Sequence, residues 1–175
     1  MPSTAISRAM EFARVDFSPR HRAPRAVAVV IATVASLVLC LLADWLLAKA
    51  AVAVFPATKG YGHFQFSDYS KLTIIGVLIA CAAWPIVARV TSDPRWVFFR
   101  LAILVTVVLL LPDLYIWLKG QPGHAVLFLA FMHLAIALIT YTMLVRVAPV
   151  REPARHGQPQ QAGTAQPGEY GSRHR

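Results

Sequence analysis

Charged residues are scarce in this 175-residue sequence, and the acidic ones are the scarcest. Asp, Glu, Lys and Arg make up 14% of the chain, whereas they make up about a quarter of an ordinary soluble domain. Hydrophobic residues account for 57%. This balance excludes an ordinary soluble domain and indicates a protein whose main solvent is lipid.

The sequence contains four long runs of apolar residues. A helix needs roughly 20 residues to cross a hydrocarbon core about 30 Å thick, and an unclosed strand would leave its backbone groups unsatisfied there. Runs of suitable length lie at 26–48, 72–90, 101–118 and 125–147, joined by short connections. The sequence therefore predicts an all-α fold, a four-helix transmembrane bundle.

The basic residues are divided by type between the two sides of this predicted bundle. The arginines precede the first run, fall around the junction of the second and third, or follow the fourth, whereas the lysines lie at the other two connections: Lys49, Lys59, Lys71 and Lys119. Since cytoplasmic loops carry the excess of Lys and Arg, the arginine-rich side predicts cytoplasmic N and C termini in a multi-pass protein of the cell membrane. The net charge of +9 thus follows membrane topology, and nucleic-acid binding is not favoured.

Two terminal segments flank the predicted 26–147 transmembrane domain. Residues 1–25 form a cytoplasmic leader that is either a short amphipathic helix with a basic stretch or partly disordered. The first apolar run is too long for a cleaved signal, so we expect it to remain as a helix. Residues 148–175 are rich in Pro, Gly and Gln and predict a disordered basic tail. Contact with anionic lipid is expected through leader arginines: Arg14, Arg20, Arg22 and Arg25.

The connection at 55–71 is the longest and is rich in aromatic residues. Rings with a polar edge favour the level of the lipid headgroups, so an aromatic belt or simple packing is the first interpretation. A short strand or a dedicated contact for a partner protein is the alternative. The rings concerned are Tyr61, Phe64, Phe66 and Tyr69.

The stretch "LLLPDLYIW" at 109–117 places a proline and an acid inside an apolar run. With a rise of 1.5 Å per residue, Asp113 lies about 9 Å, Asp44 about 7 Å and His133 about 13 Å below the outer ends of their helices. Ionisable groups within spans normally face the bundle interior and pair with another polar group. We therefore expect Asp113 to point at His133, Asp44 or both. Three interpretations stay open: a lock between helices, a small hydrated ligand or proton site, or an acid that reaches the headgroups.

Helix packing has its own sequence signals in the second and third runs. The small residues Gly76, Ala80 and Ala83 would let a neighbouring helix approach closely. Kinks are expected at Pro85 and Pro112, because proline cannot donate its backbone hydrogen bond.

Motifs that would name a reaction are missing from the sequence. It contains no Gly-rich phosphate loop, nucleophile elbow or metalloprotease signature. A haem held between helices needs two inward-facing histidines, and only His133 falls inside a predicted span. We expect no catalytic residue, no metal and no cofactor, and hence a protein that is not an enzyme.

Three segments carry a resemblance to a known family: "KLTIIGVLIACAAWPIVAR", "RLAILVTVVLLLPDLYI" and "LAFMHLAIALITYTMLVR". Together they resemble an uncharacterised actinobacterial family of small four-span membrane proteins, a domain of unknown function, over about residues 26–147. The most recognisable pieces are Met132, His133 and Leu134 in the last run and Pro112 in the third. The resemblance implies the fold and the membrane location, and it supplies no reaction.

Two functions follow as hypotheses. The favoured one is a non-enzymatic membrane protein that acts as an accessory or assembly partner of a larger envelope complex, in contact with the lipid bilayer and with a membrane-protein partner or a second copy of itself. The alternative is a small carrier or binding protein for a solute, proton or lipid, using an outward-facing polar pocket.

Overall fold

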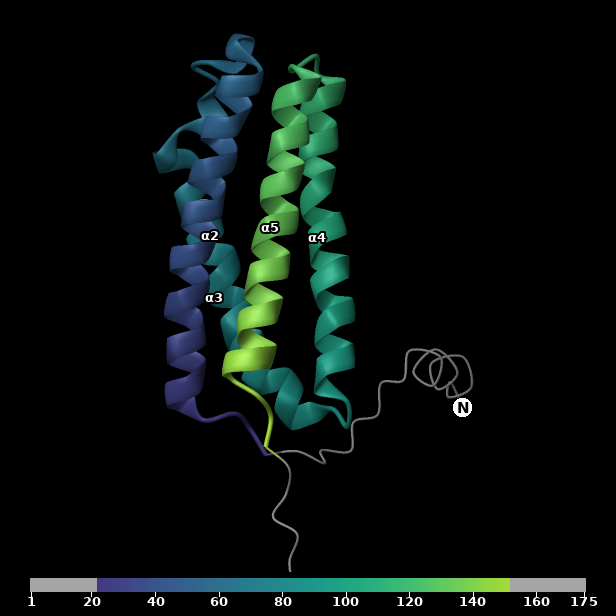
Figure 1. Ribbon diagram of the computed structural model, residues 1–175. Coiled ribbons are helices and arrows are strands. Elements are labelled where there is room, and N and C mark those ends of the chain that lie inside the picture. Colours follow the sequence, from purple (N-terminus) through teal and green to yellow (C-terminus); the bar gives the residue numbers. More distant parts are fainter. Residues whose placement is uncertain (1–21, 152–175) are drawn as a thin grey trace, which may run out of the picture.

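The computed structural model describes residues 22–151, and this part of the chain is a bundle of four long helices (Figure 1). They are α2 (Ala26–Val54), α3 (Phe66–Val90), α4 (Pro94–Leu118) and α5 (Gly123–Val147). Each of the four is long and apolar enough to cross a membrane. The predicted all-α, four-helix transmembrane fold is thereby confirmed, whereas Arg14 and Arg20, with most of the leader and the tail, lie outside the described residues.

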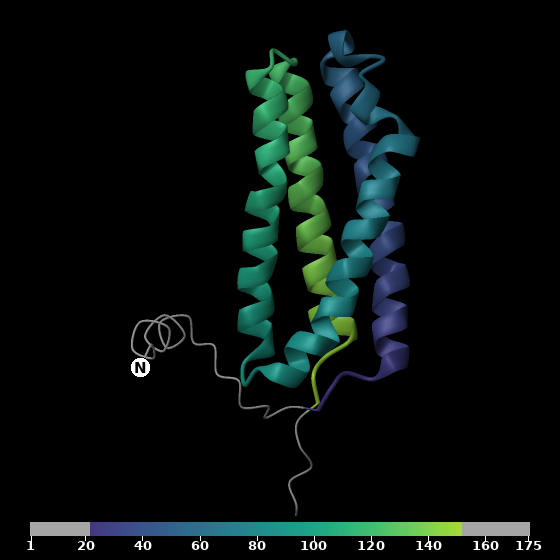
Figure 2. The same cartoon turned by 180° about the vertical axis from the view of Figure 1, so that it is seen from behind.

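The connections divide the bundle into two ends. At the loop end lie 55–65, which includes the 3₁₀ helices η1 (Pro56–Thr58) and η2 (Gly62–Phe64), and the turn 119–122. At the opposite, terminal end lie the connection 91–93 and both ends of the described chain (Figures 1 and 2). There Arg22 and Arg151 pair through two antiparallel backbone hydrogen bonds of 2.8 and 3.1 Å.

The helices run beyond the apolar runs that predicted them. Helix α2 continues to Val54 and α3 begins at Phe66, and the 3₁₀ helix η2 occupies part of "HFQF", where a short strand was the alternative interpretation. Helix α4 begins with Pro94, whose fixed φ suits a first helical position, and the Asp93 side chain accepts a hydrogen bond from the Trp96 amide at 3.4 Å. Hydropathy locates only the part of a helix that lies in hydrocarbon, so it misses the turns that extend beyond the hydrocarbon at the helix ends.

Helix α5 occupies the middle of the bundle and packs most extensively against α2 and then α4. The side of α2 that is buried carries small or polar side chains about one turn apart: Ala32, Ser36, Cys40, Asp44, Ala48 and Ala51. Small side chains let two helix backbones approach closely, which is how membrane helices gain packing energy without a hydrophobic driving force. This stripe accounts for the close pairing of α2 with α5.

The apolar core is concentrated toward the terminal end. Trp84 of α3 is fully buried there, 5.0 Å between ring centroids from Phe98 of α4, and Leu144 of α5 is also fully buried. The Trp84 Nε1 donates a hydrogen bond of 2.8 Å to the Ala148 carbonyl just after α5. A buried indole needs such an acceptor, so this contact fastens the end of α5 to α3.

The expected packing role of Gly76 is wrong for the described chain. A Cβ built on Gly76 meets nothing within 4 Å, because the buried side of α3 runs instead through Thr73, Val77 and Cys81. Ala80 is half-buried and Ala83 packs against the terminal-end core. Of the three small residues of α3, Gly76 therefore points away from the bundle, whereas Ala83 packs against its core.

Both prolines lie within continuous helices. Helix α3 continues past Pro85 and α4 past Pro112. The last part of α3, which includes Pro85, turns toward the start of α4 (Figures 1 and 2). A kink at Pro112 stays a prediction.

The outer surface of the helices is apolar. Large hydrophobic side chains are exposed along all four, and in α4 the buried residues are only Pro94, Phe98, Thr106 and Asp113. The Thr106 hydroxyl donates a hydrogen bond of 2.7 Å to the Ala102 carbonyl of its own helix. A surface of this kind is suited to lipid rather than to water.

Candidate intramembrane polar site

Three helices contribute ionisable side chains to the loop-end half of the bundle. Asp44 comes from α2, Asp113 from α4 and His133 from α5, and none of them faces outward. Asp44 is 1% exposed and Asp113 is 7% exposed. The structure thus places all three residues selected from the sequence in the interior, as expected for ionisable groups within spans.

Asp113 and His133 are in direct contact. His133 Nδ1 lies 3.0 Å from Asp113 Oδ2 and equally 3.0 Å from the Leu129 carbonyl oxygen. A carbonyl only accepts, so Nδ1 carries a proton that it donates to Leu129, one turn earlier on α5. The approach to Asp113 has an ion-pair distance without hydrogen-bond geometry, and Asp113 Oδ2 is buried with no hydrogen-bond partner.

Asp44 has a different partner, which sequence reasoning missed. The Thr73 hydroxyl of α3 donates a hydrogen bond of 2.6 Å to Asp44 Oδ2, while Asp44 Oδ1 is buried without a partner. The imidazole of His133 lies within electrostatic range of the Asp44 carboxyl. Among residues 22–151, no hydrogen bond or ion pair joins Asp44 directly to Asp113. The convergence therefore consists of two neighbouring pairs, Asp44–Thr73 and Asp113–His133.

Polar side chains continue from Asp44 toward the middle of the bundle. Cys40 Sγ lies 3.6 Å from Thr140 Oγ1 and 3.9 Å from the Ile136 carbonyl oxygen. One turn further along α2, the Ser36 hydroxyl is buried with no partner. We call Ser36, Cys40, Asp44, Thr73 and Thr140 the polar column. In the sequence, the polar column is visible only as the four-residue spacing of Ser36, Cys40 and Asp44 in α2. The threonines that complete it, Thr73 and Thr140, lie on other helices and are identified only by the packed structure.

Aromatic side chains close the polar column at the terminal end. Trp84 and Phe98 pack there, and Phe98 stacks on Tyr141 with ring centroids 6.0 Å apart. The column therefore ends in apolar core instead of continuing across the bundle.

The aromatic connection covers the polar site at the loop end. Tyr61 and Phe64 pack against a small core that contains Ala48, Tyr69 and Leu129. Tyr69 is buried at 7% exposure within α3 and so takes the packing role rather than the belt role, while Phe66 at 60% exposure faces outward. The Tyr61 hydroxyl is buried without a partner. Burial raises the pKa of Tyr61, and the negative charge of Asp113 raises it further.

Unpartnered buried polar atoms gather in this region. They are Ser36 Oγ, Asp44 Oδ1, Tyr61 Oη and Asp113 Oδ2. Such atoms accept a proton, a water molecule or a small cationic group. No cluster of three or more His, Cys, Asp or Glu side chains in the described part of the chain is arranged to hold a metal ion.

The four spans and the buried polar site define the protein as a multi-pass membrane protein with an intramembrane ionisable cluster. The chain belongs to a family of unknown function, DUF6069, whose match extends over residues 17–150. Searches of curated proteins and of solved structures gave no match.

Proposed function

We propose that the protein binds a proton or a small cationic solute between its helices, at Asp44, Asp113 and His133. The observation that supports this most is that each of the two buried carboxyl groups keeps one oxygen without a hydrogen-bond partner. An unsatisfied buried polar atom costs about 1–3 kcal/mol, and more when it is charged. A bound proton or cation at these oxygens would remove that cost.

The proposed site is reached from the loop end. The terminal side of the polar column is filled by the larger core around Trp84 and Phe98, whereas the loop side is covered by Tyr61 and Phe64 together with the smaller core of Ala48, Tyr69, Leu129 and Met132. The arginine-rich terminal end is proposed to be cytoplasmic, so the site would open outward in the cell membrane. A site that opens at one end only suits a binding protein. A carrier would have to move Trp84 and Phe98 apart so that its solute could pass to the terminal end.

Infrared titration of the protonated carboxyl band tests this proposal in the purified full-length protein. We expect a band from buried protonated carboxyl groups that changes with pH and is reduced in both Asp44→Asn and Asp113→Asn. Asp68→Asn is the matched control, because Asp68 is exposed and contacts His63 at 3.0 Å outside the cluster. A spectrum that changes equally in all three variants would overturn the proposal.

Transport is a separate property and has its own test. Proteoliposomes loaded with a pH-sensitive dye would report proton flux after an imposed gradient. Flux that is lost in Asp113→Asn while the bundle stays folded supports a carrier. Absence of flux in the wild type, together with a titrating carboxyl band, supports a static binding site.

A second candidate is a non-enzymatic accessory or assembly partner of a larger envelope complex. It is favoured by α4, which buries only four of its 25 residues and leaves a long apolar side uncovered by the rest of the described chain. Purification in mild detergent followed by identification of co-purifying proteins tests this role. A stoichiometric partner lost on substituting exposed α4 residues supports it, and a lone chain argues against it.

A further inference from the structure

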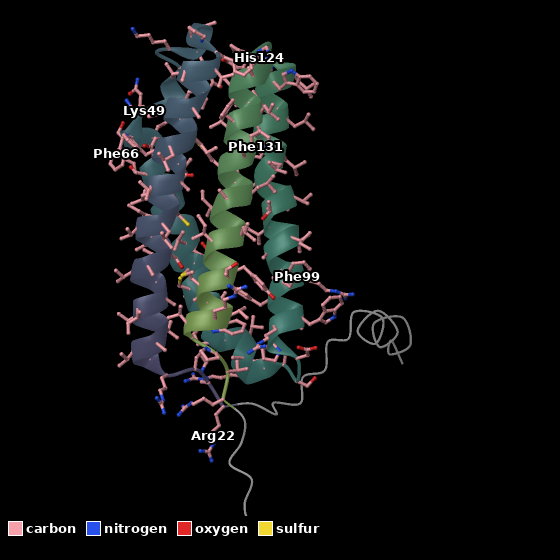
Figure 3. The ribbon with its side chains drawn as sticks, viewed as in Figure 1. Arg22, Lys49, Phe66, Phe99, His124 and Phe131 are labelled. Atoms are coloured by element: carbon pink, nitrogen blue, oxygen red, sulfur yellow. The ribbon has the colours of Figure 1, made fainter. Side chains whose placement is uncertain are left out.

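A hollow of about 260 Å³ lies outside the polar site, at the loop end of the bundle. Its walls come from the last turns of α2, from the connection and from the start of α3. Figure 3 shows the labelled Lys49 and Phe66 near one another on this side of the molecule. The side chains that line it include Trp45, Lys49, Gln65 and Phe66.

The hollow combines one cation with an aromatic rim. Lys49 Nζ lies 5.9 Å from the centroid of the Trp45 ring. Trp45 is 45% exposed and Phe66 is 60% exposed, so both rings form an open rim, while the exposed Gln65 adds an amide. The Thr58 hydroxyl has no proton free to donate to a ligand, because it already donates to the Phe55 carbonyl at 2.8 Å.

We propose that this hollow binds the headgroup of an anionic phospholipid from the leaflet at the loop end. The lipid phosphate would pair with the Lys49 ammonium, and headgroup hydroxyls would bond to the Gln65 amide. The acyl chains would leave between the Trp45 and Phe66 rings. None of these four residues belongs to the polar column, and the hollow shares with the polar site only its cover, which includes Tyr61 and Phe64.

The size of the hollow favours a headgroup over a whole organic ligand. Pockets for drug-sized molecules run from about 300 to 1,000 Å³ and enclose most of the ligand. A half-open hollow of about 260 Å³ accommodates a glycerol phosphate while the rest of the molecule stays outside.

The surroundings favour a lipid over a soluble anion. Exposed leucines continue from the rim along α2 and α3, at Leu42, Leu46 and Leu72, and offer an apolar track for acyl chains. A Trp ring beside a lysine is typical of the headgroup level of a membrane. Lys59 and Lys71 lie in the same region of the chain and add positive charge that attracts an anionic headgroup.

Native mass spectrometry of the full-length protein, incubated in detergent with phosphatidylglycerol or phosphatidylcholine, tests the proposal. Lys49→Gln should weaken phosphatidylglycerol retention about five- to tenfold, the effect of one cation near a phosphate. Lys119→Gln is the matched control, because Lys119 also lies over a ring, 5.5 Å from the Tyr115 centroid, but does not line the hollow. It should retain the lipid as the wild type does.

Phe66→Ala supplies a second measurement. Loss of the rim ring should lower retention of both lipids, with circular dichroism confirming that the helices stay folded. Equal retention in the wild type and Lys49→Gln would overturn the proposal, as would equal losses in Lys49→Gln and Lys119→Gln. Displacement of the lipid by an equimolar amount of free glycerol phosphate would also overturn it, because the site would then select a soluble anion.

Discussion

Each buried acid of this protein has a different kind of partner. Asp44 receives a hydrogen bond from a neutral hydroxyl, that of Thr73, whereas Asp113 lies against the titratable ring of His133. A hydroxyl stabilises a carboxylate without changing its own charge, but an imidazole can also take up a proton. The two acids are therefore expected to respond differently to substitution of their partners.

Thr73→Val should destabilise the bundle, because it removes the donor to Asp44 Oδ2 while keeping the shape of the side chain. The expected loss is about 0.6–2 kcal/mol, the range measured for hydrogen bonds between membrane helices. Unfolding in mixed micelles with increasing dodecyl sulfate would measure it. Thr73→Ser keeps the hydroxyl and is the control; a loss in Thr73→Ser that equals or exceeds the loss in Thr73→Val would contradict a stabilising role for the hydrogen bond.

Tyr61→Phe should leave stability at neutral pH unchanged or raise it by about 1 kcal/mol, since the buried hydroxyl it removes has no partner. Folding raises the pKa of the Tyr61 phenol above its ordinary value of 10.0. The unfolded chain therefore loses this proton more readily than the folded protein does, and stability falls as the pH rises past 10.0. Thermal melts between about pH 9 and 11 should therefore fall less steeply in the variant than in the wild type. Parallel pH profiles would contradict this account of Tyr61.

Sequence reasoning at this scale found the acids and the histidine but not their hydroxyl partners. A charged group in a span is costly, which makes Asp44, Asp113 and His133 conspicuous from composition alone. Threonine is common in membrane helices and satisfies itself on its own backbone, as Thr106 does, so nothing in the sequence distinguished Thr73. Its role depends on how α3 is rotated, which only the packed structure gives.

For the helices, hydropathy predicted their number and order. It did not predict which face of each helix packs against its neighbours. The close approach expected at Gly76 belongs instead to α2, where the small side chains face α5. Small-residue spacing occurs in both helices, and sequence alone does not say which one faces the bundle. The outward position of Gly76 leads to a test.

Gly76→Ala should be neutral or stabilise the protein by up to about 1 kcal/mol, because Ala is the better helix former and the added Cβ meets open space. Dodecyl sulfate unfolding measures the change, with size-exclusion chromatography recording the oligomeric state. A destabilised protein that also changes its oligomeric state would mean that Gly76 lies in a contact with another chain.

Trp84→Phe should weaken the junction of α3 with the end of α5. It removes the 2.8 Å hydrogen bond to the Ala148 carbonyl and leaves a gap in the terminal-end core. We expect a loss of about 2–4 kcal/mol from the combined hydrogen-bond and packing terms. Trp117→Phe is the control, since Trp117 is 54% exposed and should cost little. Similar losses in both variants would contradict a special role for the Trp84 junction.

For the whole molecule, the number of spans follows from the structure, and the side that each end faces follows only from the charge pattern. Lys59→Cys at the loop end should react with a membrane-impermeant maleimide on intact cells, whereas Arg95→Cys at the terminal end should react only after permeabilisation. The native Cys40 and Cys81 are buried and should remain unlabelled in both. The reverse pattern of labelling would invert the proposed topology.

The antiparallel bridge between Arg22 and Arg151 has a mechanical consequence. The chain enters and leaves the bundle at one point, so tension applied to both ends pulls α2 and α5 apart from the same side. The contacts between α2 and α5 would then break one helical turn after another, starting at the bridge. The two helices would not slide past each other. The most extensive helix pair of the bundle is thus also the one on which an outside force would act first.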